Sequence, residues 1–156
     1  AECMRVALGS DHAGFTYKNL LAELMRSEGY EVEDLGTYSN EACDYPDIAQ
    51  AVAEAVAKGD AARGVLLCGS GIGASVAANK VPGVRAGNVS DIYSAHQGVE
   101  HDDMNVLVLG ARTVGIEVAK ELVKAFLRAQ FSGEERHVNR LKKVTEIEKL
   151  YGKENP

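Results

Sequence analysis

The stretch from Gly64 to Ser75, GVLLCGSGIGAS, constrains the fold of this chain more than any other. Its apolar run, Val65 to Leu67, is preceded by glycine and predicts a strand buried on both faces. Alternating glycines follow, and residues 74–80 have the composition of a helix. A buried strand, a glycine-rich turn and a following helix are typical of α/β sheet proteins.

The same turn is predicted to favour negative charge. Backbone N–H groups at the start of a helix point toward one spot, with the positive end of the helix dipole behind them. Cys68 lies at the edge of that spot, so its thiol is expected to ionise more readily than a free cysteine. A base and an anion pocket would then be neighbours. Alternatively, Cys68 is only a small buried hydrophobic residue at the end of a strand.

Composition limits the classes of protein that this chain can belong to. Its 156 residues suit a single domain, 1–156, and 46% hydrophobic with 26% charged residues indicates an ordinary globular protein. A net charge of −6 argues against nucleic acid as the main partner. No apolar run is long enough for a membrane span, and no signal pattern opens the sequence. The three cysteines lack metal-like spacing, so we expect reduced thiols in a cytoplasmic protein. Separately, we expect neither a metal nor a cofactor.

Alternating apolar patterns predict five strands separated by helices. The expected strands are 5–10, 31–35, 64–67, 84–89 and 105–110, and the expected helices are 15–28, 46–58, 74–80, 90–99, one that follows Arg112 and Thr113, and about 134–151. This order predicts an α/β, Rossmann-like three-layer fold with a five-stranded parallel sheet and an extra C-terminal helix.

The expected C-terminal helix has two further features. Ser132 and Glu135 have the spacing of a capping box at its start. Its apolar residues form a narrow seam of Val138, Leu141, Val144 and Ile147. Because so narrow a seam cannot cover a sheet, we expect the helix to pack on another subunit of a homo-oligomer.

Polar residues follow three predicted strands at their carboxyl ends, where open α/β sheets bind ligands. They are Asp11 and His12 after the first strand, Cys68, Gly69 and Ser70 after the third, and Arg112 after the fifth. We therefore expect all of them at one edge of the sheet. Asp11 could instead serve only as a helix N-cap, whereas the pair Asp11 and His12 could bind sugar hydroxyls and a phosphate.

His101 lies in an acidic cluster and could act as a general acid–base near neutral pH, or be a plain surface histidine. A metal site with His96 is disfavoured, because residues five apart on a helix do not share a face. Arg136 and Arg140, four apart, do share one and could hold a phosphate monoester. Their alternative role is ion pairing with nearby glutamates on a solvated face.

A nucleotide-binding module of the flavodoxin type also stays open. The glycines of Gly69-x-Gly71-x-Gly73 lack the last glycine of the dinucleotide fingerprint. Asp91, however, follows a predicted strand roughly where a ribose-binding acid would stand.

Together these segments resemble the family of type B ribose-5-phosphate isomerases, which includes the galactose-6-phosphate isomerase subunits. The likeness spans residues 5–150 and rests on the motifs GSDHAG (9–14), DYP (44–46), LCGSGIG (67–73), AANK (77–80), Arg136 and Arg140. It implies a metal-independent aldose–ketose isomerase that interconverts ribose 5-phosphate and ribulose 5-phosphate through a cis-enediolate. It also implies a dimer or tetramer whose sites are shared across a subunit interface.

The resemblance also implies roles for single residues. Cys68 corresponds to the base that moves a proton between C2 and C1, and His101 to the group that opens the furanose ring. With Ser70 they are the catalytic candidates. The candidate substrate-binding residues are Asp11, His12, Tyr45, Gly69, Ser70, Gly71, Ile72, Gly73, Asp102, Arg112, Arg136 and Arg140. Of these, His12, Arg136 and Arg140 match phosphate ligands, Asp11 matches a sugar-hydroxyl contact, and the amides from Gly69 to Gly73 would hold the enediolate oxygen.

One position departs from the family pattern. Asp102 stands where asparagine is common, and an ionised carboxylate cannot donate a hydrogen bond. The sugar preference is therefore open, with allose or galactose 6-phosphate as the alternative. Some relatives use a glutamate after the glycine turn as the base, but residues 74–76 contain none, which leaves Cys68.

Overall fold

The structure, a computed structural model, describes residues 3–152. Its elements are β1 (Arg5–Ser10), a 3-10 turn (His12–Gly14), α1 (Phe15–Ser27), β2 (Glu31–Asp34), α2 (Tyr45–Ala57), β3 (Arg63–Cys68), α3 (Ile72–Ala78), β4 (Ala86–Asn88), α4 (Ile92–Asp102), β5 (Val106–Gly110), α5 (Ile116–Arg128) and α6 (Glu135–Tyr151). All strand pairs are parallel, in the order β2-β1-β3-β5-β4. This confirms the predicted α/β fold with a five-stranded parallel sheet.

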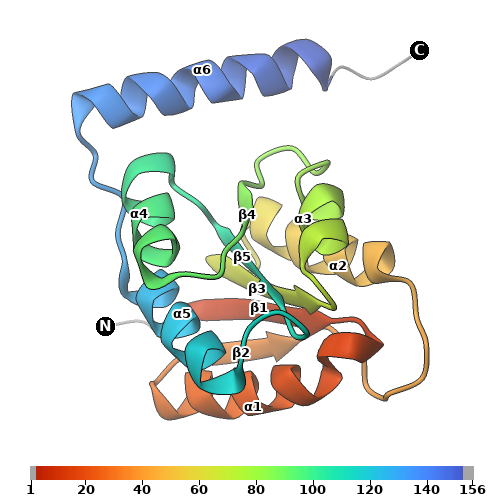
Figure 1. The fold of residues 1–156 in the computed structure, drawn as a ribbon. Coiled ribbons are helices and arrows are strands. Elements are labelled where there is room, and N and C mark those ends of the chain that lie inside the picture. Colours follow the sequence, from red (N-terminus) through yellow and green to blue (C-terminus); the bar gives the residue numbers. More distant parts are fainter. Residues whose placement is uncertain (1–2, 153–156) are drawn as a thin grey trace.

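Helices cover both faces of the sheet (Figure 1). Buried side chains of α1, α4 and α5 pack on one face, and those of α2 and α3 on the other. The three central strands β1, β3 and β5 contribute apolar residues to both cores, as the continuous apolar runs of buried parallel strands predict. Their carboxyl ends therefore form a rigid edge between the two helical layers.

Several boundaries differ from the predicted ones. β4 covers only Ala86–Asn88; at its start, the Arg85 N–H donates to the Asn105 side chain at 2.7 Å instead of to a neighbouring strand. α3 begins at Ile72 rather than at residue 74, directly after Gly71 at a φ of 86°. α4 runs to Asp102, so the acidic cluster around His101 belongs to its last turn.

The predicted capping box at α6 is wrong. The N-cap of α6 is Glu134, with no side-chain cap bond. The Ser132 hydroxyl instead pairs with His137 and accepts the Glu134 N–H at 3.2 Å. The Ser132 hydroxyl, which a capping box would use, therefore pairs with the His137 side chain instead.

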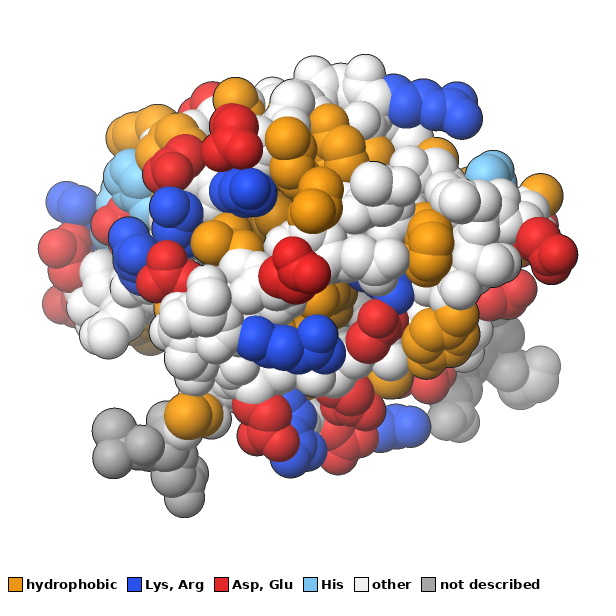
Figure 2. Space-filling model, turned by 90° about the horizontal axis from the view of Figure 1, so that it is seen from below, with side chains coloured by type: hydrophobic (Ala, Val, Ile, Leu, Met, Phe, Trp, Pro, Cys, Tyr) orange, Lys and Arg blue, Asp and Glu red, His pale blue; other side chains and the backbone are white. Residues whose placement is uncertain are grey.

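α6 projects over one end of the molecule, above α4 and α3 (Figure 1). His137 is its only buried residue within 135–151, and Val138, Val144 and Ile147 of the predicted seam are exposed. Figure 2 shows acidic, basic and apolar side chains interspersed on the face seen from below. Among residues 3–152, no helix combines the length and the apolar character that crossing a membrane requires.

Candidate active site

Cys68 ends β3 and is nearly enclosed, with 5% of its surface exposed. Its Sγ accepts the backbone N–H of Gly71 at 3.2 Å. The positive φ of Gly71 produces this geometry, because it turns the chain back over the strand end and straight into α3. An N–H donor stabilises negative charge on the sulfur, which a proton-abstracting thiolate requires.

The glycine turn leaves backbone donors available around the sulfur. The Ile72 N–H donates to the Ser70 hydroxyl at 3.2 Å, and that of Gly71 to Cys68. Within residues 3–152, the N–H groups of Gly69, Ser70 and Gly73 donate to no protein acceptor. Two of the five predicted oxyanion donors are thus used internally, and the other three have no acceptor among the described residues.

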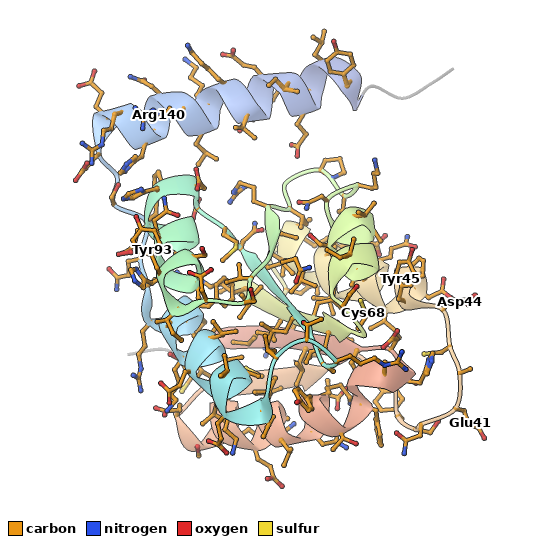
Figure 3. All side chains as sticks on the ribbon, viewed as in Figure 1. Glu41, Asp44, Tyr45, Cys68, Tyr93 and Arg140 are labelled. Atoms are coloured by element: carbon orange, nitrogen blue, oxygen red, sulfur yellow. The ribbon has the colours of Figure 1, made fainter. Side chains whose placement is uncertain are left out.

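Two side chains cover the glycine turn. A Cβ at Gly73 would lie 2.6 Å from the Tyr45 ring, so that ring rests directly on the turn. A Cβ at Gly69 would lie 3.6 Å from Cδ of Arg112, which places the Arg112 stem beside the turn. Tyr45 and Cys68 lie on the same side of the molecule in Figure 3.

Asp11 and His12 follow the neighbouring strand β1. Asp11 is buried, and its Oδ1 accepts the N–H groups of Ala13 and Gly14, so its alternative role as an N-cap is real. Nδ1 of His12 accepts the Cys43 N–H at 3.2 Å. Because that nitrogen is an acceptor, the proton of a neutral His12 ring is on Nε2, ready to donate to a ligand.

The other predicted residues lie elsewhere in the single chain. His101 and Asp102 are on α4, and Arg136 and Arg140 are on α6. In Figure 3, Arg140 lies at the opposite end of the molecule from Cys68 and Tyr45. The chain therefore carries two separate groups of candidate residues.

Around α4 and α6, Arg136 pairs with Glu134 at 3.0 Å, so its alternative role as an ion-pair partner is also real. Arg140 makes no ion pair with residues 3–152 and, with Asp102, lines a groove of about 590 Å³. The rest of the lining is mainly apolar, with Val84, Met104, Leu141, Val144 and Ile147, and it also includes Asn79, Arg85 and Glu148.

Sequence reasoning missed two side chains that contact His101. Gln97 Nε2 lies 2.9 Å from His101 Nδ1, and the His137 ring stacks on the His101 ring with centroids 4.1 Å apart. The contact of Gln97 with His101 could have been predicted, because residues four apart on a helix lie side by side. His137 gave no such signal, because its polar type and its place beside a narrow apolar seam do not predict burial. Burial, reinforced by the positive charges of His101 and Arg136, lowers the pKa of His137 below the usual histidine value.

The sequence also raised two other ligands, a nucleotide near Asp91 and a metal ion. Asp91 is the N-cap of α4, and its Oδ2 accepts the Ser94 N–H at 2.8 Å. The Asp91 carboxylate therefore caps α4 just after the edge strand β4. Among the described residues, no group of three or more His, Cys, Asp or Glu side chains is arranged to hold a metal ion.

Comparison with known proteins agrees with this architecture. Residues 6–144 match the family model described as Ribose/Galactose Isomerase. Ribose-5-phosphate isomerase B of Escherichia coli is 46% identical over 144 residues, which is 92% of this chain and 96% of that protein. D-erythrulose-4-phosphate isomerase 2 of Mycolicibacterium smegmatis is 40% identical over 82% of this chain and 86% of its own. The solved ribose-5-phosphate isomerase B of Clostridium thermocellum superposes with a TM-score of 0.92 at 47% identity, over 95% of this chain and 99% of its own.

An α/β sheet with a thiol and free amides at its carboxyl edge has the kinds of group that enzymes of proton transfer next to a carbonyl require. The chain belongs to the ribose/galactose isomerase family. It is an isomerase, and the comparisons favour this over a flavodoxin-type nucleotide-binding module.

Proposed function

We propose that this enzyme interconverts ribose 5-phosphate and ribulose 5-phosphate, with Cys68 as the base. The observation that carries the proposal is the position of the Cys68 sulfur, which accepts the Gly71 N–H at 3.2 Å inside a turn with three free amides. Removal of a proton next to a carbonyl needs a base within reach and donors for the oxygen that becomes negative. The turn supplies both.

The proposed reaction conserves atoms and charge. His101 moves the proton that opens the furanose ring and exposes the C1 aldehyde. The Cys68 thiolate then takes the C2 proton, the electron pair forms the C1–C2 double bond, and O1 becomes negative against the free amides. A proton passes from O2 to O1 by way of the exposed Ser70 hydroxyl. Finally, the Cys68 thiol returns a proton to C1 as the O2 carbonyl forms, which regenerates the thiolate.

We assign phosphate binding to His12, Arg136 and Arg140, and sugar contacts to Asp11, Tyr45, Asp102 and Arg112. The separation of Arg140 from Cys68 in one chain means that these residues can meet only between subunits (Figure 3). The apolar residues Val138, Val144 and Ile147 of α6 are exposed in one chain. Contact with a second subunit would bury them, which supports an assembly through α6. We therefore propose a homo-oligomer in which one protomer supplies the turn and its partner supplies α4 and α6.

The substrate is tested by measuring kcat/KM for ribose 5-phosphate, allose 6-phosphate and galactose 6-phosphate side by side. The proposal predicts the highest value for ribose 5-phosphate. A higher value for allose or galactose 6-phosphate would instead assign the enzyme to six-carbon sugar phosphates. Asp102→Asn would then be the first variant to test as the origin of that preference.

We also propose a cytoplasmic location, which the three free cysteines support.

A further inference from the structure

His137 is a buried histidine to which the proposed reaction gives no role. It is 3% exposed on a helix whose neighbouring residues Arg136 and Val138 face solvent. The segment before α6 and the last turn of α4 enclose it, since the Ser132 N–H donates to the Glu100 carbonyl at 2.9 Å. A buried imidazole needs partners for both ring nitrogens.

Both partners are present, and they fix the tautomer. Nε of Arg136 donates to Nε2 of His137 at 3.2 Å, and a guanidinium can only donate. Nε2 therefore has no proton, so Nδ1 carries it and donates to the Ser132 hydroxyl at 2.5 Å. The ring is neutral in this arrangement, in agreement with the lowered pKa of His137.

The face of the same ring supports His101. The two rings stack with centroids 4.1 Å apart and an interplanar angle of 25°. In the plane of the His101 ring, Gln97 donates to Nδ1 at 2.9 Å. His101 is thus held from its face by His137 and from one edge by Gln97, and its Nε2 edge remains for proton transfer.

We propose that His137 is a positioning residue, whose neutral ring holds the His101 imidazole by stacking and the Arg136 guanidinium by accepting its hydrogen bond. The inference rests on the proposed function, because it acts through His101 and Arg136. One ring thereby ties the ring-opening group to a phosphate-binding group at a fixed distance.

The neutral state matters for charge as well as for the hydrogen bond. The charged groups that face His137 are His101 on α4, Glu134 at the N-cap of α6, and Arg136 and Arg140 on α6. A protonated His137 would place a donor against the Arg136 donor and would repel a protonated His101. A neutral His137 therefore places no like charge beside the His101 ring.

Two variants separate the two contacts. His137→Gln keeps an acceptor for Arg136 but removes the aromatic stack, whereas His137→Phe keeps a stacked ring but removes the acceptor. For ribose 5-phosphate we expect His137→Gln to lower kcat by about 10- to 100-fold with little change in KM, since a small misplacement of a reacting group has such a cost. His137→Phe should mainly raise KM, because Arg136 loses its support.

A double-mutant cycle shows whether the loss passes through His101. Adding His137→Gln to His101→Ala should lower kcat no further than His101→Ala alone. A second control uses D-erythrulose 4-phosphate, which cannot form a furanose ring, so its turnover should be nearly unchanged in His137→Gln. Multiplicative losses in the cycle, or equal losses on both substrates, would show a merely structural role and overturn the proposal.

¹⁵N NMR of the wild-type enzyme tests the geometry without any activity. We expect His137 as the Nδ1–H tautomer at neutral pH, and an Nε2–H or doubly protonated ring would overturn the inference even if the variants failed to fold. If the wild type isomerised no sugar phosphate, the proposed function would fail, and the NMR result would still report the protonation of His137 by itself.

Discussion

The backbone N–H of Gly71 donates to the sulfur of Cys68 across 3.2 Å, and the chain can make this contact only because Gly71 has a φ of 86°. The conformation of one glycine thus controls both the environment of the base and the start of α3. A side chain at Gly71 would also meet Oδ1 of Asn88 at 2.5 Å.

Gly71→Ala should therefore lower kcat by at least about 100-fold, the usual cost of disturbing one oxyanion-type donor. It should also destabilise the fold by about 1–2 kcal/mol, because alanine is strained in the left-handed region. Gly59→Ala is the matched control, since Gly59 has a φ of 80° and open space around its Cα. We expect Gly59→Ala to show the backbone strain alone, Gly71→Ala to be destabilised somewhat more because its Cβ also meets Asn88, and only Gly71→Ala to lose activity; equal kcat values would refute the assignment.

Sharing of the site between subunits is tested by complementation. A heterodimer of one Cys68→Ala chain and one Arg140→Ala chain, isolated through two different tags, contains one intact site if each site draws on both chains. Its kcat/KM should approach about half that of the wild-type dimer, whereas both parent homodimers stay low. A heterodimer no more active than its parents would place Cys68 and Arg140 in separate sites.

Arg63 joins the sheet to the end of α5, far from the site. Its guanidinium donates to the carbonyl groups of Phe126, Leu127 and Ala129 at 2.6–3.3 Å. Arg63→Met keeps the apolar stem but leaves these carbonyls unpaired, so it should lower the free energy of unfolding by about 2–4 kcal/mol in urea. Arg5→Met, which breaks only an exposed pair with Glu31, should change the midpoint little. Equal shifts for both variants would contradict this.

Stability should fall in mild acid because of His137. Its folded pKa lies below the unfolded value of about 6.5, so between the two values the unfolded chain binds more protons. The contribution of His137 is then fully present above pH 6.5 and is lost as pH falls through the folded pKa. Urea midpoints should drop from pH 7.5 to 5.5 by less in His137→Gln than in the wild type. The same drop in both proteins would exclude His137 as a cause.

The sheet and the glycine turn could be predicted from the sequence because their signals are local. The apolar run before Cys68 and the glycines after it define strand, turn and helix within twelve residues of chain. Gly73 misled the prediction of where α3 starts, because glycine is a poor helix former. The turn conformation of Gly71, and not helix propensity, decides that boundary.

Contacts between distant segments had no such signal. The Cys43 N–H on His12, the Tyr45 ring on Gly73 and the His137 ring on His101 each depend on how the layers pack. The family resemblance placed Arg140 and Cys68 in one site shared between subunits, and a single chain holds them apart (Figure 3). Their meeting remains a prediction about the assembly.

The most direct measurement of the central claim is proton exchange at the reacting carbons. Ribose 5-phosphate is incubated in ²H₂O with wild-type enzyme, Cys68→Ala, or the exposed-cysteine control Cys3→Ala, and ¹H NMR follows the C2 and C1 positions. We predict deuterium incorporation by the wild type and Cys3→Ala, and a rate at least about 100-fold lower in folded Cys68→Ala. Exchange by Cys68→Ala at a near wild-type rate would contradict the role of Cys68 as the base.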